Sequence, residues 1–217
     1  MRDISFSIDA GESVGLLGAN GAGKSSTLKA ILGMLRPITG EIQTLGASPG
    51  SLISFEKLGF APEEGVPPDY LTGKEYLGFV SALKNSPQGG QDPQVDELLS
   101  WFELDPNKPI REYSKGMKRR IVLAQSFLGG PQLIILDEPL NGLDPLMIIK
   151  LRTRLNETRE KGTALLYSSH ILSEVEKCCS RVLILKEGKL VLDASISAIT
   201  DEFGSVENAF AKKVGDS

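Results

Sequence analysis

A glycine-rich segment near the start of the chain has the residue types and the spacing that cradle a phosphate chain. It runs from Gly18 to Ser25 (GANGAGKS) and matches the pattern G-x-x-x-x-G-K-[ST] at every fixed position. In such a loop main-chain N–H groups point inward, the lysine reaches the β- and γ-phosphates, and the last hydroxyl can ligate Mg²⁺. We therefore predict that nucleotide phosphates are bound by one continuous group of residues: Gly18, Asn20, Gly21, Ala22, Gly23, Lys24, Ser25 and Ser26.

Two carboxylates follow an apolar run later in the chain. Leu-Ile-Ile-Leu precedes Asp137 and Glu138, which would place both acids at the carboxyl end of a buried strand, the usual ligand edge of an open α/β sheet. There Asp137 would hold magnesium, and Glu138 would orient or deprotonate an attacking water. Without the phosphate loop, these acids would indicate only a strand that emerges into solvent. With it, they predict nucleoside triphosphate hydrolysis.

The single histidine of the chain, His170, follows a second apolar strand at 164–168. A lone histidine is more often a packed or surface residue. A parallel strand beside the one that ends at Glu138 would nevertheless bring His170 to the same edge, where an imidazole can hydrogen-bond a γ-phosphate oxygen. We therefore predict His170, Glu138 and Lys24 as the catalytic residues.

The elements that must position these residues are predicted from hydrophobic periodicity. A short strand at 13–17 and a helix at 24–35 flank the glycine-rich loop, which is the context that the motif requires. Early strands are predicted at 4–8, where apolar residues alternate with serines, and at 41–45 and 58–61. After residue 130, strands alternate with helices: strands at 133–137, 164–168 and 181–185, and helices at 145–161 and 171–178.

Between about residues 63 and 130, the apolar residues have helical spacing instead. We predict an α/β fold: a phosphate-loop NTPase core with a mostly parallel sheet, short antiparallel N-terminal strands and an inserted α-helical subdomain. One domain would cover 1–217, with the core at 1–62 and 131–217 and the helical subdomain at about 63–130. A chain of 217 residues can bury one such core.

Composition and charge exclude several classes of protein. A net charge of −4 argues against nucleic acid as the main partner, because phosphate-backbone binding needs a clustered basic surface. Cys178 and Cys179 are adjacent, so they predict neither a disulfide framework nor a zinc site, and a reducing cytosol fits them. No apolar stretch approaches the roughly 20 residues that span a bilayer, and no secretory leader is evident. We therefore expect any membrane role to be peripheral.

A basic segment opens one of the predicted helices of the middle region. Ser114 is a good N-cap, and Lys115, Lys118, Arg119 and Arg120 follow it. The plain interpretation is a capped amphipathic helix. Cations are disfavoured at a helix N-terminus, however, which suggests that an anion binds there.

Taken together, the chain resembles the ATPase subunit of an ABC transporter, over essentially its whole length and in five ordered motifs. Besides the phosphate loop and the strand that ends in Asp137 and Glu138, the histidine at 170 resembles the family's switch histidine. The segment Ser114, Lys115, Gly116 and Met117 resembles the family signature Leu-Ser-Gly-Gly-Gln. The segment 139–145, which contains Asn141, Gly142 and Asp144, resembles the loop of the family that follows the catalytic glutamate and crosses the dimer interface. We call this segment the interface loop.

The resemblance implies a head-to-tail dimer that hydrolyses ATP with Mg²⁺, in which Ser114 and Gly116 of one subunit contact the ATP of the other. It implies a transmembrane permease subunit as partner and a second ATPase subunit, identical or paired. It also implies a peripheral location on the cytoplasmic face of the cell membrane, with export as the expected direction. A soluble ABC-type ATPase that acts on ribosomes or DNA, and a module that uses ATP only to dimerise, remain the alternatives.

Two departures from the family pattern stand out. Glu63 occupies the place where the family usually has a glutamine, and we predict it as a metal ligand with Ser25 and Asp137, although it can be a plain loop acid. Family members also usually have a further strand and an adenine-stacking aromatic before the stretch that resembles 2–6, and this sequence contains neither. Near the other end, 205–210 resembles the short closing helix of exporter-type ATPases.

Overall fold

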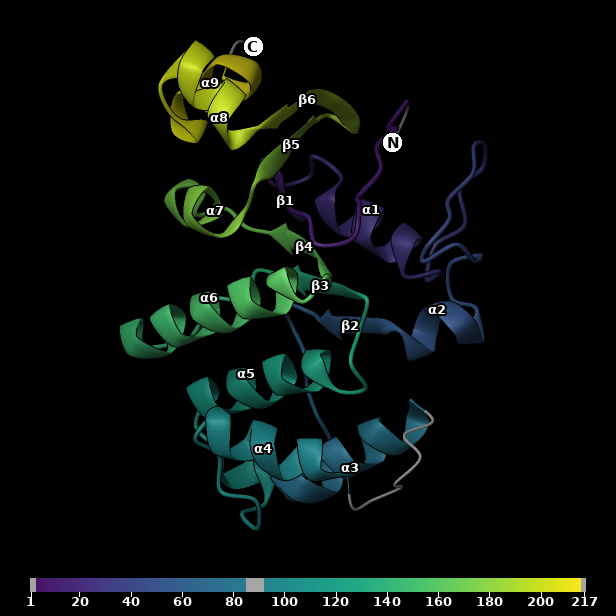
Figure 1. Cartoon of the computed structure of the whole chain (residues 1–217), viewed down its shortest axis with the longest axis vertical. Helices are drawn as coiled ribbons and strands as arrows, with labels where there is room; N and C mark the ends of the chain where they lie inside the picture. Colours follow the sequence, from purple (N-terminus) through teal and green to yellow (C-terminus); the bar gives the residue numbers. More distant parts are fainter. Residues whose placement is uncertain (1–2, 85–91, 216–217) are drawn as a thin grey trace.

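The computed structural model describes residues 3–84 and 92–215. It is organised around a six-stranded sheet with the order β2-β3-β4-β1-β5-β6 (Figure 1). Each neighbouring pair is parallel except β5 and β6, which are antiparallel. The strands are β1 (Ser13–Gly18), β2 (Leu58–Ala61), β3 (Leu133–Asp137), β4 (Ala164–Ser168), β5 (Arg181–Lys186) and β6 (Lys189–Ser195).

Helices surround this sheet. In Figure 1, α3, α4 and α5 lie beyond the β2 edge, and α8 and α9 lie at the β6 edge. The helices are α1 (Lys24–Ile31), α2 (Leu52–Glu56), α3 (Gly73–Leu83), α4 (Pro93–Trp101), α5 (Lys115–Ala124), α6 (Pro145–Glu160), α7 (Leu172–Cys178), α8 (Ile196–Phe203) and α9 (Val206–Val214), with short 3₁₀ turns η2 (Ile110–Glu112) and η3 (Gln125–Phe127).

The central strands are buried on both faces. Every residue of β1 and β4 is buried, as are the first four residues of β3, which is why these strands are continuous apolar runs rather than alternating ones. One hydrophobic cluster on each side of the sheet covers them. The predicted α/β class with a mostly parallel sheet is confirmed, and the predicted strands at 133–137 and 164–168 coincide with β3 and β4.

The predicted N-terminal antiparallel strands are wrong for the residues that the structure describes. Ile4, Phe6 and Ile8 do alternate in burial and pack against a core cluster, but they pair with no strand of the described chain. At 41–45 only one isolated bridge forms, between Thr44 and Ala47. Alternation therefore reported a half-buried surface correctly, whereas a strand also needs a hydrogen-bonded neighbour. The antiparallel strand of this sheet is β6, near the other end of the chain.

The helix predicted at 24–35 ends early. It stops at Ile31, because Gly33 adopts a left-handed conformation (φ 77°) that ends the helix. Helices α3, α4 and α5 do occupy the region predicted to be helical. Its division from the core at about residues 63 and 130 stays a prediction.

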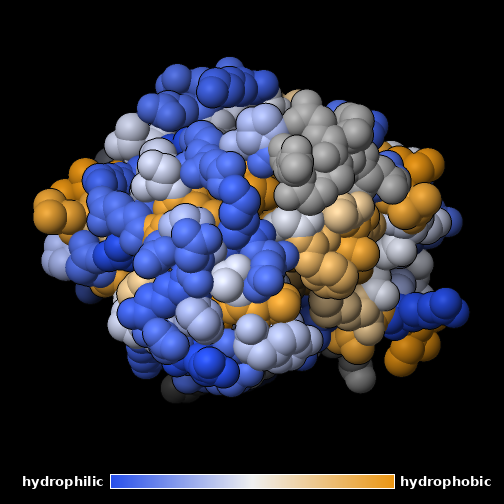
Figure 2. Space-filling model, turned by 90° about the horizontal axis from the view of Figure 1, so that it is seen from below, coloured by the Kyte–Doolittle hydropathy of each residue, from blue (hydrophilic) through white to orange (hydrophobic). Residues whose placement is uncertain are grey.

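One apolar surface remains exposed on α2 and α3. The view from the α3–α4 end shows hydrophobic side chains at several places on a mostly hydrophilic surface, including a group on the right (Figure 2). The two helices are linked at their C-terminal ends, because Lys84 Nζ, at the end of α3, donates to Leu58 O, just after α2. We call this the α2–α3 apolar surface, and it comprises Leu52, Ile53, Phe55, Phe79 and Leu83.

The part of the chain that the structure describes contains no helix that is both long and apolar enough to cross a bilayer.

Candidate functional site

The phosphate loop connects β1 directly to α1. Gly21 and Gly23 have φ values of 80° and 108°, in the left-handed region that favours glycine. Gly18 is required for a different reason, since a Cβ there would lie 2.7 Å from Leu185 O. No side chain caps α1, so the N–H groups of its first turn are available to bind an anion.

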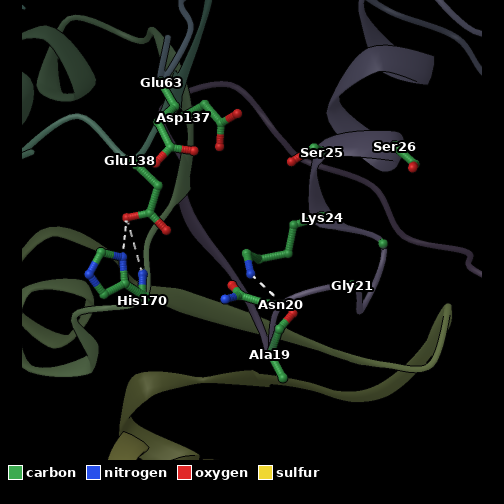
Figure 3. A pocket seen from close by; sticks show the side chains of 11 residues that line it. Ala19, Asn20, Gly21, Lys24, Ser25, Ser26, Glu63, Asp137, Glu138 and His170 are labelled. Carbon is green, nitrogen blue, oxygen red and sulfur yellow. Dashed lines mark hydrogen bonds and ion pairs between the residues drawn. The ribbon is translucent and has the colours of Figure 1, made fainter.

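Lys24 extends its ammonium group into the curve of this loop. Its Nζ donates to Gly18 O at 2.5 Å and to Ala19 O at 3.4 Å. Figure 3 shows the side chain lying along the loop, with the Ser25 hydroxyl pointing across the cavity toward Asp137 and Glu63. The loop therefore presents one cation, one hydroxyl and a helix N-terminus to the same space.

The carboxylates of Asp137 and Glu138 lie across that space, at the end of β3. Glu138 is buried, with 8% of its surface exposed, and its Oε2 accepts hydrogen bonds from His170 Nδ1 at 2.7 Å and His170 N at 3.3 Å. Its other oxygen points into the cavity (Figure 3). Asp137 Oδ1 accepts a 2.5 Å hydrogen bond from Ser168 Oγ. Because β3 and β4 are parallel, with Asp137 beside Ser168, the ends of both strands deliver these groups to one edge.

The main chain at Glu138 is strained. Its φ is 47°, in the left-handed region that side-chain-bearing residues rarely adopt. The turn is held by hydrogen bonds on both sides of the residue, since Glu138 N donates to Ser168 O and Asn141 N donates to Glu138 O. Such conformations are kept where the surroundings determine them fully, and they cluster at functional sites.

Together these residues line a cavity of about 510 Å³ (Figure 3). Most of the predicted nucleotide-binding, catalytic and metal residues line it, whereas Gly18 and Ala22 support the loop from behind. The lining residues are Ala19, Asn20, Gly21, Gly23, Lys24, Ser25, Ser26, Glu63, Asp137, Glu138 and His170.

The oxygen donors in this cavity fit a hard cation such as Mg²⁺. Ser25, Asp137 and Glu63 supply a hydroxyl and two carboxylates, and magnesium prefers oxygen ligands. Among the described residues, no cluster of three or more acidic, histidine or cysteine side chains could hold a metal alone. Mg²⁺ is usually bound by one or two carboxylates together with substrate phosphates and water.

The signature segment lies outside this cavity. Ser114 caps α5 by accepting from Met117 N at 3.2 Å, as predicted. A Cβ at Gly116 would lie 3.2 Å from Gly142 O, so the signature and the interface loop of one chain are neighbours. Neither segment lines the cavity formed by the same chain's phosphate loop.

Two cations of the basic segment, Arg119 and Arg120, have partners within the protein. Arg120 pairs with Asp144 at 2.6 Å and with Glu103 at 3.4 Å. The pKa of the Asp144 carboxyl is held below its usual range, first by the hydrogen bond from Met147 N and then by that from Arg120. Arg119 turns inward and is buried. The remaining lysines, Lys115 and Lys118, are the cations of the segment that could meet an anion.

Sequence reasoning missed Ser168, which hydrogen-bonds Asp137, and the inward role of Arg119. Ser168 ends the strand that precedes His170, and the same strand-end logic that found the histidine could have found it. No local signal distinguishes Arg119 from its basic neighbours, because its partners are distant in the chain.

Comparisons with known proteins assign the family. The family described as ABC transporter matches residues 1–141. An uncharacterized ABC transporter ATP-binding protein of Nostoc sp. is 38% identical over 203 residues, which make up 92% of this chain and 61% of that protein. The Nod factor export ATP-binding protein I of Rhizobium johnstonii is 34% identical over 207 residues, 93% of this chain and 66% of that protein. A solved structure of an ATP-binding subunit of an ABC transporter, 33% identical, superimposes with a TM-score of 0.90 over 97% of this chain and 91% of that one.

This chain therefore spans roughly three fifths to two thirds of the length of these two relatives. The family match covers more than half of the chain, and the solved subunit shares the fold over nearly its whole length. The chain belongs to the ABC transporter family.

Proposed function

We propose that this chain hydrolyses ATP as one half of a head-to-tail dimer and thereby powers transport by a membrane-embedded permease subunit. The observation that carries the proposal is the position of Glu138. One of its oxygens is held by His170, and the other points into the cavity that Lys24 and Ser25 line from the opposite side. A base on one wall and a phosphate-binding loop on the other are the arrangement that hydrolysis of a terminal phosphate requires.

The residues divide the work by their chemistry. Lys24 and the N–H groups at the start of α1 bind the phosphates and stabilise the charge that develops on them. Glu138 orients or deprotonates the attacking water. A Mg²⁺ ion held by Ser25 and Asp137, with Glu63 beside them, would neutralise charge on the β- and γ-phosphates.

His170 has a specific proton requirement in this role. Its Nδ1 lies 2.7 Å from Glu138 Oε2, so Nδ1 carries the proton when Glu138 is ionised. The Nε2 atom of a neutral ring would then only accept hydrogen bonds. To donate to a γ-phosphate oxygen while it holds Glu138, His170 must therefore be doubly protonated. Its side chain is 62% exposed, so solvent reaches the ring.

The dimer is proposed because the signature residues, which are expected to contact ATP, do not line the cavity of a single chain. Ser114 and Gly116 lie beside the interface loop of their own chain, away from the phosphate loop. A second subunit placed head to tail would bring its Ser114, Lys115, Gly116 and Met117 to this cavity. Whether the two ATPase subunits are identical or paired does not alter this requirement.

A permease partner and a location on the cytoplasmic face of the cell membrane are proposed from the family. The α2–α3 apolar surface supports this, because it leaves large hydrophobic side chains exposed where a partner could cover them. Export is the proposed direction. A relative named Nod factor export ATP-binding protein I supports it, since this chain is 34% identical to that protein.

The test is Glu138→Gln, with phosphate release measured against protein concentration. For the wild type, we expect activity that rises faster than linearly with protein, because two chains complete each site. The variant should retain ATP binding and dimerise more strongly, while turnover falls by on the order of 10³-fold, a typical loss for a general base. Turnover at the wild-type rate would contradict the assignment of the base. Dimerisation by ATP without phosphate release from the wild type would instead identify an ATP-gated dimerisation module.

A further inference from the structure

Arg119 is the charged side chain most deeply enclosed near the site. Only 7% of its surface is exposed, although it lies in a segment that is otherwise basic and partly accessible. Burial lowers its pKa, and the nearby carboxylates of Asp137, Glu63 and Glu138 oppose that shift. A charge is retained in such a place only when its hydrogen-bonding capacity is used.

The guanidinium group of Arg119 hydrogen-bonds main-chain carbonyls and no carboxylate oxygen in the described structure. Nη2 donates to Asp137 O at 2.9 Å and to Glu138 O at 2.8 Å, and Nε donates to Pro139 O at 3.3 Å. On the other side, Nη1 donates to Pro62 O at 2.5 Å and to Glu63 O at 3.2 Å. One side chain thus bridges two segments that are more than 70 residues apart in the chain.

Those two segments carry carboxylates of the cavity. The segment after β2 bears Glu63, and the segment after β3 bears Asp137 and Glu138. Arg119 binds the main chain at each of these residues and leaves their side chains free to face the cavity. It also holds the carbonyl of Glu138, the residue whose main chain is in the left-handed conformation.

A guanidinium is suited to this arrangement because it is planar and its five N–H donors keep a fixed relative geometry. A lysine offers three donors from one atom and cannot span two segments in the same way. Arg119 also lies in α5, the helix that Ser114 opens, so it connects the signature helix to both carboxylate-bearing segments.

We propose that Arg119 is a positioning residue, which sets the main chain of Glu138 and of Glu63 relative to each other and to α5. The proposal rests on the proposed ATPase function only where it concerns turnover. Its structural part, that Arg119 orders the two segments, can be tested in any nucleotide state.

The first test compares the kinetics of Arg119→Lys and Arg119→Met with those of the wild type. We expect kcat to fall by on the order of 10²-fold, the loss that a misplacement of about 1 Å produces. KM for ATP should change less than about threefold, because the phosphate loop is untouched. The lysine variant should fail to rescue kcat, since it restores the charge but not the bridge. Unchanged kcat in both folded variants would overturn the proposal.

The second test measures amide hydrogen exchange in the same proteins. Exchange should accelerate at Glu138 and Asn141, whose N–H groups bond to Ser168 O and Glu138 O, and in the segment at 61–65. Exchange in β1 and α1 should stay at the wild-type rate. Unchanged exchange at 138–141 would overturn the proposal even if turnover fell.

Arg154→Lys is the matched control. Arg154 is also partly buried and engages Glu97 through two hydrogen bonds, but it lies on α6 and pairs with α4, outside the cavity. We expect lower thermal stability with wild-type kcat. An equal loss of kcat in this control would show a general effect of stability and overturn the positioning role. If the wild type releases no phosphate, the proposed function fails, and the exchange experiment still decides the role of Arg119.

Discussion

The two walls of the cavity are built in different ways. The phosphate-loop wall is one continuous segment, 18–26, between β1 and α1, and glycines and main-chain hydrogen bonds shape it. The opposite wall includes Glu63, which follows β2, and among the described residues β2 is an edge strand that pairs only with β3. Side chains from the helical region bind carbonyls along β2: Lys84 bonds Leu58 O, Gln125 bonds Phe60 O and Arg119 bonds Pro62 O.

This difference shows how an edge strand can be fixed without a second neighbouring strand. An unpaired edge presents carbonyl and N–H groups that need partners. Here long polar side chains from α3, α5 and η3 supply donors, so the position of Glu63 depends on the packing of the helical region. The phosphate loop depends on its own residues and on the two elements that flank it. Variants that act on one wall and leave the other intact can test the contrast.

The largest effect is expected from Lys24→Ala, which alters the phosphate-loop wall. Loss of the cation should reduce ATP turnover by on the order of 10³-fold, the cost of removing a group that stabilises developing charge. ATP affinity should fall as well, while the fold and β2 stay intact. Phosphate release and equilibrium ATP binding measure both effects. Lys29→Ala, an exposed lysine on the same helix, is the control and should behave as the wild type.

A smaller effect is expected from Lys84→Met, which removes the side chain that bonds Leu58 O at the start of β2. Desolvation lowers the pKa of Lys84 from 10.5 to about 8. Between these values the unfolded chain binds more protons than the folded one, so this group makes the free energy of unfolding rise with pH across that window. The pKa difference of about 2.5 corresponds to about 3 kcal/mol.

Chemical denaturation of the wild type and of Lys84→Met at pH 7.5, 8.5 and 9.5 measures the pH-dependent contribution of Lys84 to the free energy of unfolding. Burial also raises the pKa of Cys178 and Cys179, to about 11 and about 12, and these thiols lower stability as pH rises. They are present in both proteins, so the difference between the two curves isolates Lys84. Parallel curves would mean that Lys84 titrates normally. Lys57→Met, at an exposed position, is the control.

The smallest effect on folding is expected from Ser114→Ala, and it separates capping from catalysis. Ser114 Oγ accepts from Met117 N, and loss of such an N-cap typically costs about 1 kcal/mol in the free energy of unfolding. Ser205→Ala removes an equivalent cap from α9, where Ser205 Oγ accepts from Asn208 N at 3.1 Å. We expect equal stability losses, with ATP turnover reduced only in Ser114→Ala. Equal turnover in both would contradict the contact of Ser114 with the partner's ATP.

Much of the fold was predictable because its signals are local. Continuous apolar runs specify strands that are covered on both faces, so β3 and β4 matched their predicted bounds. The alternation of apolar and polar residues at 4–8 led to a wrong strand prediction, because it indicates a half-buried surface and not a hydrogen-bonded neighbour. Strand β6, with partly exposed residues, offered no comparable run and was missed.

The sequence by itself determined the phosphate loop, since the conformation of that segment follows from its own glycines, its lysine and the elements that flank it. It also determined that Asp137, Glu138 and His170 end parallel strands, and hence that they meet at one edge. Only the tertiary structure decided that Arg119 faces inward while Arg120 pairs with Asp144 and Glu103. The physical reason is that the partners of Arg119 are carbonyls of two distant segments, which exist as a set of acceptors only after the helical region has packed against β2 and β3.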